Sequence, residues 1–201
     1  MWEAATEPPA DLKPELCLAN LTLYFDTNII GDARPATAEL WRCREEGWIC
    51  IQKGDALDDE LSTRQDPDHR AELLAESEPL AESYGVLVVG SSKLGRSVLA
   101  ADDEVETFEA VKRLLFPNKI RFKDRDIRDV RHVHTALKYQ ADIFVTRDGF
   151  RKQRDAFRAV FPMDLLTPED ALTVARERIT EAREARQPGE TRWLPGWTPG
   201  A

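Results

Sequence analysis

LTLYFDTN, from Leu21 to Asn28, is the stretch of sequence that decides the fold. Its first five residues belong to an apolar, β-prone segment from Leu18 to Phe25. Such a run is typical of a buried strand. Asp26 follows directly, so a carboxylate stands at the tip of a rigid strand. A carboxylate held in this way suits a hard metal cation as a ligand. The same position also suits the N-cap of the next helix, and that alternative remains open.

Predicted strands and helices alternate along the rest of the chain. Further strands are expected at 48–51, 85–89, 143–145 and 163–166. A turn at Lys53-Gly54 leads into one of the helices, which are expected at 35–47, 55–63, 66–82, 108–115, 126–139, 151–160 and 167–186. This alternation predicts a three-layer α/β/α fold with a central, mostly parallel, Rossmann-like sheet. In such sheets, ligands bind at the carboxyl ends of the strands.

The chain of 201 residues is long enough for one well-buried domain. We expect this domain at 16–175, with an extended middle region at 62–119. Residues 1–15 are expected to form a flexible N-terminal arm. Residues 176–201 are expected to hold the end of the last helix and a flexible tail.

Two features favour a cytoplasmic protein with no membrane partner. No run of about 18 apolar residues predicts a transmembrane helix, and the first 15 residues lack the basic and apolar regions of a secretory signal. Because the cysteines are scattered and odd in number, they suit reduced thiols in a reducing compartment: Cys17, Cys43 and Cys50.

Charge is distributed unevenly along the chain. The formal net charge is -9, yet the segment from Pro117 to Arg158 holds twelve Lys or Arg and six Asp. The remainder carries 16 basic and 31 acidic residues. A basic segment in an acidic protein is compatible with nucleic-acid binding, because local charge matters more than the sum. Ordinary scatter of surface charge is the alternative.

Three further acidic residues are candidate partners of Asp26. Asp148 comes just after the predicted strand 143–145, so it also stands at a strand tip. Asp129 begins the helical stretch DVRHVHTAL. Glu60 lies in LDDEL, residues 57–61, whose two leucines are one helical turn apart. We expect the leucines to face the core and the acids to face the other way.

The order of these motifs resembles the PIN-domain family of metal-dependent ribonucleases. The pieces read LYFDTN (23–28), DDEL (58–61), DVRHVHTA (129–136) and IFVTRDGF (143–150), and DLLTPEDAL (164–172) is similar to the family's closing strand and helix. The resemblance spans 18–172. The second motif departs from the family, which usually shows one clear Glu. Glu60 takes that role because Leu61 follows it, and Asp59 is the alternative.

The resemblance implies a PIN-like endoribonuclease that hydrolyses single-stranded or structured RNA with Mg²⁺ or Mn²⁺. The implied catalytic metal ligands are Asp26, Glu60, Asp129 and Asp148. Residues that would orient these ligands are Thr27, Asn28 and Thr146. Candidate RNA-binding residues are Arg125, Arg128, Arg147, Arg151 and Lys152. Implied partners are the RNA substrate, an antitoxin protein if the chain is the toxin of a toxin–antitoxin pair, and a second copy in a homodimer.

Two other functions remain as alternatives. The first is a catalytically inactive PIN-like module that binds or scaffolds a partner. The second is a nucleotide-binding switch, because Gly90 to Ser97 nearly matches a phosphate-binding loop. Arg96 stands where that loop requires Lys, which argues against it. His132 and His134 point to different helix faces, and neither is assigned to catalysis. The resemblance implies a structural role for His132.

Overall fold

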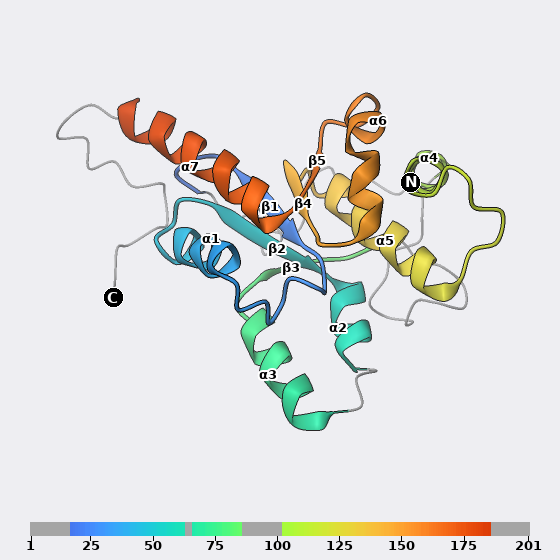
Figure 1. Cartoon of the computed structure of the whole chain (residues 1–201), viewed down its shortest axis with the longest axis horizontal. Helices are drawn as coiled ribbons and strands as arrows, with labels where there is room; N and C mark the ends of the chain where they lie inside the picture. Colours follow the sequence, from blue (N-terminus) through green and yellow to red (C-terminus); the bar gives the residue numbers. More distant parts are fainter. Residues whose placement is uncertain (1–16, 63–65, 86–101, 186–201) are drawn as a thin grey trace, which may run out of the picture.

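The computed structural model describes residues 17–62, 66–85 and 102–185 (Figure 1). The strands of this part form one five-stranded sheet in the order β3-β2-β1-β4-β5. Every neighbouring pair is parallel. The strands are β1 Thr22–Phe25, β2 Cys50–Gly54, β3 Ala81–Ser83, β4 Ile143–Val145 and β5 Asp164–Leu166.

The topological switch point of the sheet lies between β1 and β4. The chain builds β2 and β3 on one side of β1, then returns to place β4 and β5 on the other side. Phe25 pairs with Val145, so the carboxyl ends of the two central strands lie next to each other. This point is where open parallel sheets bind their ligands, because the connections diverge there and leave a crevice.

Helices cover both faces of the sheet (Figure 1). On one face, Leu23 and Phe25 pack in a core with side chains of four helices. On the other face, Tyr24 and Phe144 pack in a second core with three different helices. The first group is α1 Pro35–Glu45, α2 Asp55–Ser62, α3 Pro67–Ser77 and α7 Pro168–Glu184. The second is α4 Asp102–Leu115, α5 Asp124–Lys138 and α6 Arg154–Arg158. The predicted three-layer α/β/α fold is confirmed.

Helix α2 (Asp55–Ser62) follows β2 and contacts both α3 and α5. Leu57 and Leu61 are fully buried, as the spacing of the leucines predicts. Glu60 remains partly exposed on the side toward α5, where its carboxylate meets Arg128. Helix α2 therefore brings an acid to the sheet edge where β1 and β4 end.

Two element boundaries differ from the sequence predictions near β1 and β2. The strand expected from Leu18 starts only at Thr22, because Asn20 adopts a positive φ of 46° and closes a turn. The turn expected at Lys53-Gly54 is wrong, since both residues belong to β2. A Cβ on Gly54 would collide with the Tyr24 side chain, so this glycine allows close packing rather than a turn.

The middle region also differs from prediction. The helix expected to reach residue 82 ends at Ser77, and β3 follows at Ala81–Ser83. This short edge strand has no apolar pattern, so its sequence does not reveal it. Gly85 lies outside any strand, while residues 86–89 of the expected strand and the loop from Gly90 to Ser97 lie outside the described residues, as do 1–15 and the tail from 186.

The other predicted helices and strands overlap observed elements, although β2 begins two residues later than expected, at Cys50, and α4 begins six residues earlier, at Asp102. The predicted helix at 151–160 is divided into the 3-10 helix η2 (Gly149–Gln153) and α6. In the three described ranges, no helix has the length and apolar character needed to span a membrane.

Candidate functional site

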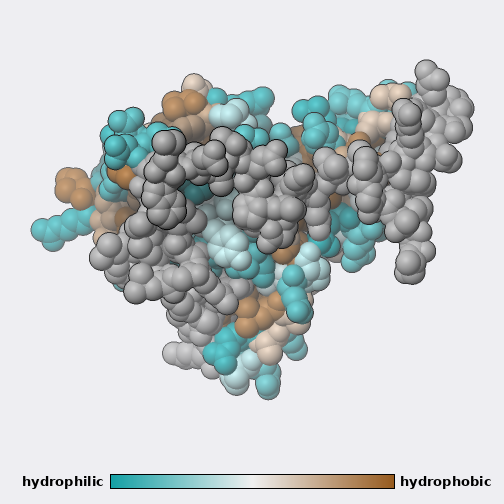
Figure 2. All heavy atoms as spheres, turned by 180° about the vertical axis from the view of Figure 1, so that it is seen from behind, coloured by the Kyte–Doolittle hydropathy of each residue, from teal (hydrophilic) through white to brown (hydrophobic). Residues whose placement is uncertain are grey.

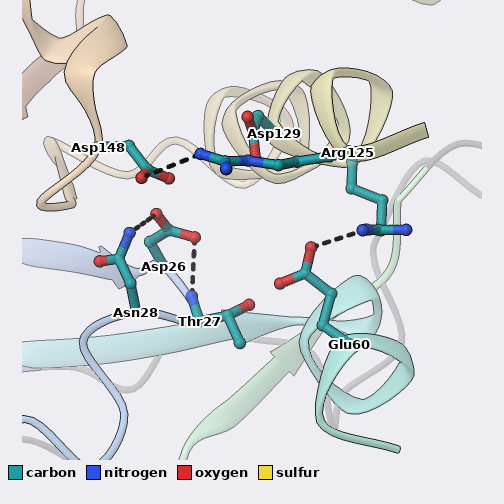
Figure 3. A pocket seen from close by; sticks show the side chains of 8 residues that line it. Asp26, Thr27, Asn28, Glu60, Arg125, Asp129 and Asp148 are labelled. Carbon is teal, nitrogen blue, oxygen red and sulfur yellow. Dashed lines mark hydrogen bonds and ion pairs between the residues drawn. The ribbon is translucent and has the colours of Figure 1, made fainter. Parts of the chain in front are cut away.

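A pocket lies at the carboxyl ends of β1 and β4 (Figure 3). It contains all four acidic residues selected from the sequence, and they come from four separate segments. Two follow the central strands, one lies on α2 and one on α5. The lining residues are Asp26, Thr27, Asn28, Glu60, Arg125, Arg128, Asp129 and Asp148.

Asp26 is the most rigidly held of the four carboxylates. It is 5% exposed. One of its oxygens accepts a hydrogen bond from the Thr27 backbone N–H at 2.8 Å. The other accepts from Asn28 Nδ2 at 2.7 Å and from Thr146 Oγ1 at 2.6 Å. Burial raises the pKa of Asp26 to about 6, although the charge of His132 and the hydrogen bond from Thr146 act in the opposite direction.

Asp26 is not a helix cap. Helix α1 begins at Pro35, and its N-cap residue is Arg34. The donors to the Asp26 carboxylate come from the turn after β1 and from the end of β4, and none of them is an N–H of α1. The alternative of a simple helix cap is therefore wrong.

Thr146 ties the two strand ends together. Its hydroxyl donates to Asp26 and accepts from the Asp148 backbone N–H at 3.0 Å. Asn28 adds a second link, because its Oδ1 accepts from the Arg147 backbone N–H at 3.1 Å. The predicted orienting residues Asn28 and Thr146 thus both touch the Asp26 carboxylate. Thr27 does so through its backbone.

Asp129 faces Asp26 from α5. Burial raises its pKa to about 7, and the charges of Asp26 and Asp148 add to that effect. Asp148 is 28% exposed at its side chain and lies 3.7 Å from the Arg125 guanidinium. Three carboxylates that repel one another across a small space favour either a proton or a bound cation. This electrostatic arrangement is the property that a metal site requires.

Glu60 has the opposite electrostatic character. Burial tends to raise its pKa, but hydrogen bonding and the charge of His132 outweigh it, with help from Thr27 and Arg128. The result is a pKa of about 2. Its Oε1 accepts from Arg128 Nε at 3.0 Å. Glu60 is thus ionised at neutral pH. The side chain of Asp59, its alternative, lies outside the described residues.

His132 contacts the site as a buried supporting residue, and the family resemblance implies a structural position for it. It is 1% exposed. Its Nδ1 lies 3.3 Å from Tyr24 Oη, and its Nε2 lies 3.4 Å from Thr27 Oγ1 and 3.8 Å from Glu60 Oε2. Its spacing of three residues from Asp129 on one helix was the available signal. His134 packs elsewhere, against Phe108.

Two of the five candidate RNA-binding residues line the pocket, namely Arg125 and Arg128. Arg147 points elsewhere: its guanidinium donates to Asp32 at 2.8 Å and to both Glu169 oxygens. Arg151 donates to the backbone carbonyls of Arg147 and Asp148. Neither Arg151 nor Lys152 is among the lining residues.

The donor set fits a hard cation, although its carboxylates are not all turned toward one point. Within the described ranges, no three Asp, Glu, His or Cys side chains are gathered closely enough to hold a metal ion. Two of the acids instead face arginines, Asp148 toward Arg125 and Glu60 toward Arg128 (Figure 3). Arg125 is 71% exposed, so rotation of its side chain into solvent releases Asp148. Carboxylate oxygens are the ligands that Mg²⁺ and Mn²⁺ prefer.

Comparison with known proteins adds no assignment to this geometry. No family model matches the chain, and no curated protein matches it significantly.

Proposed function

We propose that the protein is a cytoplasmic, metal-dependent endoribonuclease of the PIN type. The observation that carries the proposal is the convergence of Asp26, Glu60, Asp129 and Asp148 on one pocket at the sheet's switch point. Burial and the charges of neighbouring acids raise the pKa values of Asp26 and Asp129, and carboxyl groups with perturbed pKa values in one pocket are typical of functional sites. The motif order that resembles PIN ribonucleases is a separate argument for the same conclusion.

Asp26, Asp129 and Asp148 would hold Mg²⁺ or Mn²⁺ in this proposal. Glu60 would be the fourth carboxylate that lines the pocket. When bound, the metal supplies an activated water and positive charge at the phosphate. The three hydrogen bonds to Asp26 fix its orientation, so it does not have to reorganise during the reaction.

The two arginines have a matching role. Arg125 and Arg128 neutralise the acids while no phosphate is present. A phosphodiester in the pocket offers both guanidinium groups a new anion to bind. The carboxylates are then free to serve as ligands. In the proposed reaction, water adds to phosphorus and the bond from phosphorus to the 3′ oxygen breaks. The products are a 5′-phosphate and a 3′-hydroxyl.

The direct test is cleavage of single-stranded RNA in the presence of Mn²⁺. We expect the wild type to cleave, EDTA to abolish cleavage, and Asp26→Asn to lower the rate at least 100-fold, on the order of effects seen for metal-positioning groups. Asp155→Asn on α6 is the matched control, because Asp155 is exposed and not among the pocket residues. Equal inactivity of the wild type and Asp26→Asn over a range of RNAs would refute the enzyme and favour the inactive scaffold.

A further inference from the structure

A second pocket adjoins the carboxylate pocket. The two share Arg125, Asp129 and Asp148, so one leads into the other. The residues that only the second pocket contributes are mostly basic or aromatic, whereas acids are the most numerous residues in the lining of the first pocket. The second pocket is lined by Phe116, Lys119, Lys123, Arg125, Asp126, Asp129, Asp148, Gly149 and Phe150. Most of the new lining residues belong to the loop between α4 and α5 or to the start of α5.

That loop, residues 116–123, is braced by the buried Asp126. One Asp126 oxygen accepts from Lys119 Nζ at 2.6 Å, and the other accepts from the Lys123 backbone N–H at 2.8 Å. Asp126 is only 7% exposed. A single carboxylate therefore fixes two points of the loop, one near its middle and one at its end.

Aromatic rings stiffen the same loop. The rings of Phe116 and Phe122, at its two ends, meet edge to face at 6.1 Å between centroids. Lys119 lies over the Phe116 ring at 4.9 Å, and Lys112 of α4 lies over the Phe122 ring at 5.0 Å. Contacts of this kind hold a loop in one conformation before a ligand arrives, which lowers the entropic cost of binding.

Ile120 projects from this braced loop into solvent. The residue is 95% exposed, compared with 58% for Val160 and 50% for Val105. It stands between Lys119 and Arg121, so an apolar group is flanked by two cations. Figure 2 shows a hydrophobic group among hydrophilic ones projecting at the end of the molecule where this loop lies. Complete exposure of an isoleucine is unfavourable, and a rigid loop cannot fold it inward.

We propose that the second pocket and loop 116–123 bind the nucleotides that flank the cleaved phosphate of a single RNA strand. Lys123 and Arg125 contact backbone phosphates, and Ile120 packs against an unstacked base. This inference rests on the proposed function, since it takes the carboxylate pocket as the place of cleavage. It adds the direction in which the strand leaves that pocket and names a base contact.

The combination of groups favours single-stranded RNA over other partners. Cations along a groove follow a phosphate backbone, and apolar side chains cover the faces of bases that are not stacked in a duplex. Bases within a duplex do not expose those faces. A protein partner would meet the same loop through acidic residues, and the experiment below separates the two.

The experiment measures binding without cleavage, in the Asp26→Asn background. A fluorescein-labelled single-stranded RNA of about 16 nucleotides is titrated by anisotropy at several salt concentrations. We expect Ile120→Ser to lower affinity about threefold to tenfold, with little change in salt dependence. Lys123→Gln should lower affinity and reduce the slope of log K against log salt by about 0.7, the value for one phosphate contact to a single strand.

Matched controls come from exposed residues that line neither pocket. Val160→Ser and Arg178→Gln should bind the RNA within about twofold of the background, because both residues are exposed and neither lines a pocket. The same RNA annealed into a duplex should bind more weakly and should not distinguish Ile120→Ser from the background.

Unchanged affinity and salt slope in both loop variants would overturn the inference and favour a protein-binding loop. This outcome is separate from failure of the proposed function. A wild type that binds the RNA through Ile120 and Lys123 but never cleaves it would refute the nuclease and leave the binding inference in place.

Discussion

Asp129 and Asp26 are two acids whose negative charges the fold tolerates poorly. Both carboxylates have raised pKa values, about 7 for Asp129 and about 6 for Asp26, with burial as the largest cause. An acid whose pKa rises on folding holds a proton that the unfolded chain releases at lower pH. Between about pH 4 and pH 7, the folded state therefore binds more protons, and its stability decreases as the pH rises. A bound cation would remove this penalty.

Asp129→Asn tests this electrostatic cost. We expect the variant to be more stable than the metal-free wild type at pH 8 by about 1 to 3 kcal/mol, because it carries no charge to bury. Near pH 4 the difference should nearly vanish, since the wild-type carboxyl is then protonated in the folded state. Urea unfolding in EDTA at both pH values measures the free energy of unfolding of the variant and of the wild type, with Asp155→Asn as the exposed control. A difference in stability that is the same at both pH values would contradict a raised pKa of Asp129 in the folded protein.

At the scale of elements, the segments that supply the candidate site were the most predictable parts of the sequence. The segments around Asp26 and Asp148 combine an apolar strand with a polar tip, and both signals are local. The short strand β3 was not predictable, because its three residues form a strand only through pairing with β2. The partners of Arg147, Asp32 and Glu169, could not be predicted because they are distant in sequence. The same holds for the contacts of His132 with Tyr24 and Thr27, although the resemblance implies a structural role for this histidine.

Gly54 gives a prediction at this scale. A Cβ at this position would collide with the Tyr24 side chain, whose ring is fully buried between the sheet and α5. We expect Gly54→Ala to destabilise the fold by about 2 to 4 kcal/mol, because neither β2 nor the packed ring can move freely. The midpoint of urea unfolding measures the change.

Gly149→Ala is the matched control for that substitution. A Cβ on Gly149 would meet no atom within 4 Å, apart from its immediate chain neighbours. We expect its stability to stay within about 0.5 kcal/mol of the wild type. If Gly54→Ala is equally neutral, the close approach of Tyr24 to β2 is not what requires the glycine.

At the scale of the whole molecule, the site lies where the two halves of the sheet meet. Strands β1 to β3 supply Asp26 and, through α2, Glu60, while the later half supplies Asp129 and Asp148. Although the net charge of the chain is -9, one segment that includes α5 and most of loop 116–123 is basic. Ligands that bridge both halves at this point bind the folded chain and not the unfolded one, so they stabilise the whole fold.

Divalent metal ions should therefore raise the melting temperature. We expect Mn²⁺ to stabilise the wild type clearly at pH 8 and much less at pH 5, because Asp26 and Asp129 must lose their protons to act as ligands. Differential scanning fluorimetry measures the shift. Asp26→Asn and Asp129→Asn should lose most of it, and Asp155→Asn should keep it. An equal shift at both pH values would place the bound metal elsewhere.

The most direct test of the central claim is anomalous diffraction from crystals grown with Mn²⁺ near pH 8. We predict an anomalous peak in the pocket, coordinated by carboxylate oxygens of Asp26, Asp129 and Asp148, with the Arg125 side chain turned away from Asp148. A map with no peak there, and with the Arg125–Asp148 and Arg128–Glu60 ion pairs intact at high Mn²⁺, would contradict a metal-dependent site.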